Sequence, residues 1–161
     1  MIDLVYLREG KTLKLTYYIQ RGDNYEGFLT YSVPENLNED EVYARQLCEY
    51  FVVKGKEYKL LSNEMAGKEE VLVVEEKGDA RRFSDEKNYK GQGVHIEFRE
   101  YRESGDMRLI RAMPLATHWE VIRYLLKDVI DIPEIGQFLR DSTEIDEDRG
   151  VYVIYLGKMV L

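Results

Sequence analysis

Apolar and polar side chains alternate with a period of two in several short runs of this sequence, and this alternation constrains the fold more than any other feature. In residues 12–20, Leu13, Leu15, Tyr17 and Ile19 fall on one side of an extended chain, while threonine, lysine, tyrosine and glutamine residues fall on the other. Side chains alternate in this way on a β-strand that has one face buried and one face in water. The chain is therefore expected to fold around a β-sheet.

The turn residues between such runs divide the chain into strands. A short connection that contains Gly10 joins residues 2–8 to residues 12–20 in a predicted hairpin, and the turn Ser104-Gly105-Asp106 joins two later runs in a second hairpin. The expected strands are residues 2–8, 12–20, 25–33, 57–62, 70–76, 93–103, 107–113 and 151–156.

Capping residues predict the helices. Asn38 and Thr117 are each followed three residues later by a glutamate, which is typical of a capping box at a helix N-terminus. Apolar residues at helical spacing then predict helices over residues 39–53 and 117–129. Glu41, Arg45 and Glu49 are expected on the wet face of the first helix, at i, i+4 spacing. The sequence Asp131-Ile132-Pro133 predicts a third, short helix that runs through Leu139.

This order of elements predicts an α+β fold with a mainly antiparallel sheet of about 7–8 strands, two principal helices and one short helix. No low-complexity linker divides the chain, so residues 1–161 are expected to form a single globular domain. Each half contains a hairpin, a proline and a capped helix, but the side chains do not match, so the pattern alone does not indicate a repeat. The residues expected in the core are Leu47, Phe51, Ile122 and Leu126.

Charge and cysteine content limit the compartment and the partners. The chain carries 31 acidic and 23 basic residues, for a net charge of −8, and this excess of acid predicts no general binding to nucleic acid. The single cysteine, Cys48, cannot form an internal disulfide, which favours a reducing compartment. No signal-peptide pattern and no apolar run long enough for a membrane span is found in the sequence, so a cytoplasmic protein without a membrane partner is expected.

The most varied polar surface is expected on the strand at residues 93–103. His95, Glu97, Arg99 and Tyr101 project from one side of this strand, and the facing strand can add Arg108 and Arg111. A base, an acid, a guanidinium and a phenol in one row can bind an anion or carry acid–base chemistry. The alternative is a solvated strand face that is held by cross-strand charge pairs. These six residues are the candidate binding site.

Other polar features have simpler interpretations. His118 at a helix start is either a surface residue or a neutral electrophile. The acidic segment 141–149 lacks the calcium-loop spacing and is expected to be a solvated loop. Cys48 lies on an apolar helix face and is expected in the core. Motifs for phosphate loops, zinc proteases and serine hydrolases are absent from the sequence, so neither a metal site nor a cofactor is predicted.

Two classes of function follow from these features. The first is a small acidic, non-catalytic module that binds a protein partner or a small anionic ligand, because tyrosines on an open sheet face provide contact area. The second is an enzyme that acts on a phosphorylated or nucleotide substrate through the His95, Glu97 and Arg99 row. The sequence does not decide between catalysis and binding, and it does not define the oligomeric state.

Overall fold

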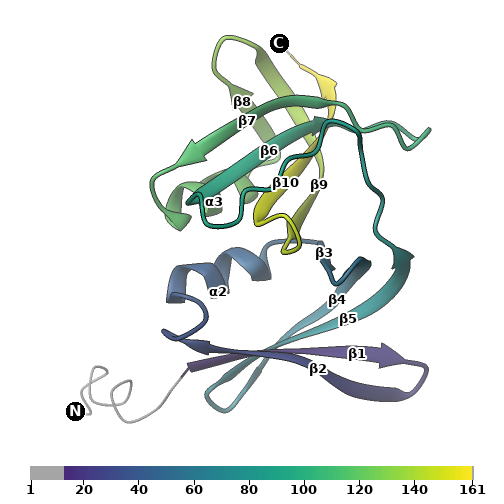
Figure 1. Ribbon diagram of the computed structural model, residues 1–161, viewed down its shortest axis with the longest axis vertical. Helices are drawn as coiled ribbons and strands as arrows, with labels where there is room; N and C mark the ends of the chain where they lie inside the picture. Colours follow the sequence, from purple (N-terminus) through teal and green to yellow (C-terminus); the bar gives the residue numbers. More distant parts are fainter. Residues whose placement is uncertain (1–12, 161) are drawn as a thin grey trace.

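The alternating runs form strands of one sheet in the structure, a computed structural model that describes residues 13–160 (Figure 1). The predicted strand at residues 2–8 lies outside the described residues. The elements in chain order are β1 (Leu13–Arg21), β2 (Asn24–Val33), α2 (Glu39–Gln46), β3 (Tyr50–Val53), β4 (Lys56–Ala66), β5 (Glu69–Asp79), β6 (Val94–Glu100), β7 (Leu109–Leu115), α3 (His118–Leu125), β8 (Val129–Ile132), β9 (Gly136–Asp146) and β10 (Val151–Met159).

The sheet is mixed, and the prediction of a mainly antiparallel sheet with 7–8 strands is wrong. Ten strands are present within residues 13–160, in the order β2-β1-β5-β4-β3-β9-β10-β6-β7, with β8 paired to β9. The pairs β1–β5, β3–β9 and β6–β10 are parallel, and the other pairs are antiparallel. Parallel pairing joins segments that are distant in the chain, so turn signals between neighbouring runs do not reveal it.

Two predicted helical segments are strands instead. The predicted helix 39–53 ends at Gln46, and its last residues form β3, because β-branched Val52 and Val53 lead into a tight turn with positive φ at Lys54 and Gly55. The predicted third helix is the β8–β9 hairpin. Ile130 and Ile132 are buried two residues apart, which is strand spacing, so only α2 and α3 are helical within the described chain.

The helix starts are where the capping residues predict them. The Asn38 side chain accepts a hydrogen bond from the Glu41 N–H at 2.9 Å, and the Glu120 carboxylate accepts one from the N–H of the N-cap residue Thr117 at 3.4 Å. The capping boxes of both helices are thus confirmed. Neither helix in residues 13–160 is long and apolar enough to cross a membrane.

The observed core contains some of the residues that were predicted to be buried. Phe51, Ile122 and Cys48 are buried, and Leu47 packs against the core while partly exposed. Leu126 is 59% exposed, so its assignment to the core is wrong. The helix that precedes it ends at Leu125, which is the residue that fills the core.

The chain contains an internal structural repeat. A unit of two strands, one helix and three strands occurs twice, first as β1–β5 with α2 and then as β6–β10 with α3. Within each unit the first and last strands pair in parallel, and the last three strands form an antiparallel meander. Figure 1 shows the two repeats one above the other along the longest axis.

Strand register confirms that the two repeats are equivalent. The first strands carry an irregularity at the same place, after Tyr17 and after Phe98. A second irregularity interrupts β4 between Leu60 and Ser62. In β9 an irregularity lies opposite the step from Tyr155 to Leu156, and this is the position in β9 that corresponds to the interruption in β4. By these registers, residues 50–53 correspond to 129–132 and residues 56–66 to 136–146.

A short joint connects the two repeats. Tyr50, Phe51 and Val52 of β3 pair in parallel with Glu144, Ile145 and Asp146 of β9. The Glu147 N–H donates to the Val52 carbonyl at 2.8 Å, and the Asp148 carboxylate accepts from the N–H groups of Lys54 and Gly55, each at 2.8 Å. The joint makes the sheet continuous through both repeats, and its β9–β10 turn meets the first repeat beside α2.

Candidate functional site

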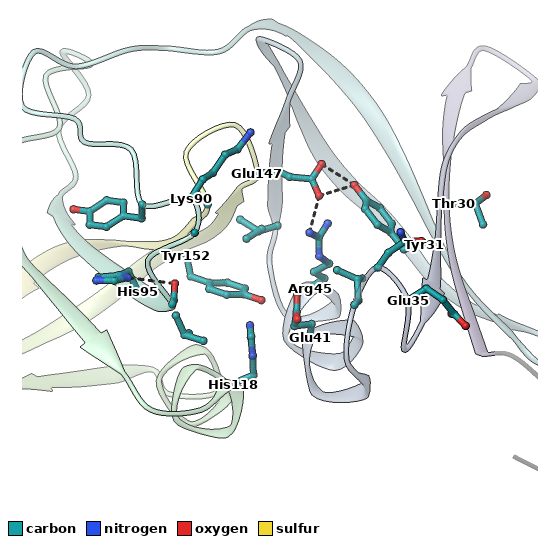
Figure 2. A pocket seen from close by; sticks show the side chains of 18 residues that line it. Thr30, Tyr31, Glu35, Glu41, Arg45, Lys90, His95, His118, Glu147 and Tyr152 are labelled. Atoms are coloured by element: carbon teal, nitrogen blue, oxygen red, sulfur yellow. Dashed lines mark hydrogen bonds and ion pairs between the residues drawn. The ribbon is translucent and has the colours of Figure 1, made fainter. Parts of the chain in front are cut away.

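A pocket with a volume of about 830 Å³ lies between the two repeats (Figure 2). Its walls come from β2 and α2 of the first repeat, from β6, α3 and the β9–β10 turn of the second, and from the loop that connects the repeats. The lining residues are Thr30, Tyr31, Glu35, Asn36, Leu37, Glu41, Arg45, Tyr89, Lys90, Gly91, Gly93, Val94, His95, His118, Ile145, Glu147, Gly150 and Tyr152.

Arg45 provides the buried positive charge of this pocket. It projects from the last turn of α2, is only 6% exposed, and donates from Nη2 to Glu147 Oε1 at 2.7 Å. The Tyr31 hydroxyl donates to both oxygens of the same carboxylate, at 2.6 and 2.7 Å, and the Arg45 guanidinium lies 4.6 Å from the Tyr31 ring centre. The three side chains form one packed group on one wall, which Figure 2 shows.

Two nitrogens of this guanidinium have no protein acceptor. Nε and Nη1 of Arg45 are buried and have no acceptor with good hydrogen-bond geometry among residues 13–160, although the buried Tyr17 hydroxyl lies close to the guanidinium. Burial lowers the pKa of Arg45, but the electrostatic effects of Tyr17 and Glu147 outweigh burial. Together they hold the pKa of Arg45 well above its usual value. A charged group with unused donors in a buried wall has the chemistry to bind an acceptor oxygen of a ligand.

Both histidines of the chain line the same pocket, on the wall opposite Arg45. His95 comes from the start of β6, and its Nδ1 is 3.3 Å from the Gly93 carbonyl oxygen. His118 is the first residue of α3 and contacts the Tyr152 ring edge to face, at 5.8 Å between centroids. Burial lowers the pKa of His118, opposed by Glu41 and Asp40, which favours the neutral form of its imidazole.

The connecting loop closes the pocket. The Tyr89 N–H donates to the Arg149 carbonyl at 2.7 Å, which holds the loop against the β9–β10 turn. Gly150 has a φ of +68°, and a Cβ atom there would lie 3.1 Å from Lys90 Cγ, so this close approach requires glycine. The Lys90 side chain is thereby placed at the pocket, between the two walls.

Most of the predicted polar row lies outside this pocket. Glu97 and Arg99 are fully buried beneath the loop of residues 80–93, and among the six candidate residues only His95 lines the pocket. Tyr101 is exposed beyond the end of β6. Arg108 pairs with Glu100 at 3.0 Å, and Arg111 donates to the Pro133 carbonyl at 2.6 Å.

Glu97 is the centre of a buried ion network. Its two oxygens accept from Arg149 Nη1 and Nη2, each at 2.9 Å, and also from Arg99 Nε and the Tyr89 hydroxyl, both at 2.9 Å. Burial raises the pKa of Glu97, but Arg149 and Arg99 outweigh this effect and lower it overall. Arg99 also pairs with Asp85 of the loop at 2.7 Å. The network neutralises its own charges and fixes the loop to the sheet.

Sequence reasoning missed Arg45, Glu147 and Tyr152, whereas Tyr31 was expected to provide contact area on an open sheet face. The i, i+4 spacing with Glu41 and Glu49 indicates an exposed Arg45, and this expectation is wrong because the second repeat covers that position. The segment 141–149 is not a solvated loop, since residues 141–146 belong to β9 and Glu144 and Asp146 are buried. Within residues 13–160, no group of three or more His, Cys, Asp or Glu side chains is arranged to hold a metal ion.

Comparison with protein-family models, with curated proteins and with solved structures finds no match to this chain. The geometry of the pocket is therefore the basis for assigning a function.

Proposed function

We propose that the protein is a non-catalytic binding module that holds a small ligand with one anionic group in the pocket between its repeats. The observation that carries this proposal is the buried guanidinium of Arg45, with two donors that no described residue uses. A carboxylate or phosphate oxygen in the pocket would accept from these donors once the Arg45 side chain shifts to present them, and such a charge-assisted hydrogen bond is stronger than a neutral one. The pocket volume of about 830 Å³ is within the usual range for small-molecule sites.

The remaining wall chemistry limits the ligand further. Lys90 adds a second positive charge, whereas Glu35, Glu41 and Glu147 add three negative ones. A ligand with several negative charges would be repelled by these carboxylates, so one anionic group combined with hydrogen-bond donors is the best match. The rings of Tyr31 and Tyr152 offer flat apolar surface for the rest of the molecule.

Binding is favoured over catalysis by the position of the polar row. The enzyme hypothesis requires Glu97 and Arg99 to reach a substrate, but both are buried in ion pairs beneath the connecting loop. The acidic composition continues to argue against general binding of nucleic acid. We also propose a reducing, cytoplasmic location, since the only cysteine, Cys48, is buried just after α2 and has no internal partner.

The test uses the two imidazoles as reporters. NMR spectra of the histidine side chains are recorded with a library of small carboxylates and phosphates, and His95→Gln assigns the two signals. We expect at least one compound to shift the His118 signal in a saturable way. Arg45→Lys keeps the charge beside Glu147 but loses the planar fork, so binding should weaken by about tenfold or more. Arg108→Lys, at an exposed arginine just before β7, is the matched control.

Two results would contradict the proposed function. One is a library in which no compound moves either histidine signal at about millimolar concentration, where even weak ligands bind. The other is a ligand whose affinity is the same in Arg45→Lys and in the unmodified protein, because the anionic group would then lie elsewhere. Melting curves of each variant separate a local effect from unfolding.

A further inference from the structure

Besides the outer edges of the terminal strands β2 and β7, two further strand edges remain unpaired within residues 13–160. The outer edge of β8 has no neighbour, since β8 pairs only with β9, and residues 63–66 of β4 pair only with β5. Figure 1 shows β8 in the upper repeat and the β4–β5 turn at the lower end of the molecule. Unpaired edges offer N–H and carbonyl groups that another strand can bind.

These two edges are the structural equivalents of the two edges that join the repeats. Residues 63–66 of β4 correspond to residues 143–146 of β9, and β8 corresponds to β3. Ile145 of the joint is buried, whereas the equivalent Met65 is 81% exposed. Val129, equivalent to Tyr50, is 43% exposed. Each end of the molecule thus carries one half of a second joint, and the apolar side chains of both halves are exposed to solvent.

The hydrogen-bonding chemistry of the joint is also retained. Thr143 Oγ1 donates to the Leu47 carbonyl at 3.0 Å and accepts from the Glu49 N–H at 3.1 Å, which ties β9 to the end of α2. The residue equivalent to Thr143 is Asn63, which is exposed and whose amide can both donate and accept. The two groups that Thr143 binds in the existing joint have equivalents after α3, which are the Leu126 carbonyl and the Asp128 N–H.

A hollow of about 190 Å³ lies beside β8 where the second joint would form. It is lined by Arg123, Tyr124, Lys127 and Pro133 together with residues 129–131 of β8. In the existing joint Ile145 pairs with Phe51, and Ile130 is the equivalent of Phe51. The same register places Met65 of an incoming strand opposite Ile130, at this hollow.

We propose that copies of this chain associate head to tail, with β8 of one copy pairing in parallel with residues 63–66 of β4 in the next. The interface is heterologous, so it leaves both end edges free and propagates into open chains or closes into rings. The joint should be weaker than the internal one. The β4–β5 turn has no counterpart of Asp148, and Pro133 lacks an N–H group for such a cap.

The experiment combines two variants that each block one edge. Met65→Lys places a charge at the centre of the β4 edge, and Val129→Lys does the same on β8. Both residues are exposed, so neither change should lower the melting temperature. By sedimentation velocity up to about 1 mM protein, the unmodified chain should form species larger than dimers, and each variant alone should be monomeric. An equimolar mixture should form dimers and nothing larger, because one intact joint remains.

Tyr25→Lys, on the exposed part of β2, is the control and should associate like the unmodified chain. The proposal is overturned if the unmodified chain stays monomeric at about 1 mM. It is also overturned if either single variant still associates, which would indicate a symmetric contact of one edge with itself. A mixture of the two variants that remains monomeric would likewise contradict a head-to-tail joint.

Discussion

Glu144 should make the stability of the protein fall as the pH rises from about 4.5 to about 8. Its carboxyl group is buried in β9 at the joint between the repeats, and no arginine or lysine among residues 13–160 donates a hydrogen bond to it. Burial, reinforced by Asp146, raises the pKa of Glu144 from 4.5 to about 8. The Tyr155 hydroxyl lies 3.4 Å from each carboxylate oxygen, which is too far to stabilise the charge strongly.

The direction of this change in stability with pH follows from proton linkage. A carboxyl group with a raised pKa in the folded state binds a proton that the unfolded state has released, so its contribution is complete below pH 4.5 and is lost as the pH rises through about 8. At about 1.4 kcal/mol for each pH unit, the difference between the two pKa values sets an upper limit of roughly 5 kcal/mol. Local rearrangement and water entry reduce this, so a loss of ~2–4 kcal/mol is expected.

Glu144→Gln tests this reasoning because glutamine has the shape of the protonated acid and cannot ionise. Urea unfolding at about pH 5 and about pH 9 should give nearly equal stability for both proteins at the lower pH, with the variant more stable by ~2–4 kcal/mol at the higher pH. The matched control is Glu64→Gln, at the equivalent and exposed position of β4. If Glu144→Gln gains the same stability at both pH values, or none at the higher one, the ionisation of Glu144 is not responsible.

Three further outcomes are expected in urea unfolding at neutral pH. Leu125→Ala should cost ~2–5 kcal/mol and Leu126→Ala less than ~0.5 kcal/mol, and the reverse order would mean that the buried face of α3 is misassigned. Glu97→Gln should cost ~3–5 kcal/mol, because two buried guanidinium groups lose their shared countercharge, and a loss below ~1 kcal/mol would show that the network contributes little. Asn38→Ala should cost ~1 kcal/mol through the lost N-cap, and an unchanged midpoint would exclude that role.

Local signals predicted most strands and both helix starts, since alternation and capping depend on residues close together in the chain. The strand at 12–20 and the caps at Asn38 and Thr117 are examples. The helix end was harder to place. Phe51 continues the helical spacing of α2, but Val52 and Val53 are β-branched and the next two residues form a turn, which ends the helix early.

The candidate site was only partly predictable because its walls come from distant segments. Arg45 and Glu147 are separated by 102 positions, and nothing near Arg45 in the sequence indicates a partner that would bury it. The internal repeat was concealed for a related reason. The repeats share register, yet Tyr17 of one corresponds to Phe98 of the other and Arg45 to Tyr124, so the sequences diverge where the topology is the same.

The polar row on β6 is explained by the loop that connects the repeats. The loop of residues 80–93 is mostly exposed, but Phe83 and the buried Tyr89 pack in one cluster with Val151 and Val153, and side chains of the second repeat bind polar groups of the loop. Arg149 Nη1 donates to the Lys87 carbonyl at 3.1 Å, and the Asp85 carboxylate accepts from the Leu109 N–H at 3.0 Å.

The first repeat has Thr16 and Tyr18 at the positions of Glu97 and Arg99. The charges in the second repeat therefore accompany the loop, which continues directly into the pocket wall through Tyr89 and Lys90. We infer that Glu97, which accepts from the Tyr89 hydroxyl at 2.9 Å, acts on the pocket by positioning this wall and not by contact with a ligand. The varied polar face that the sequence presents is thus needed to hold the loop in place, and the loop in turn completes the site.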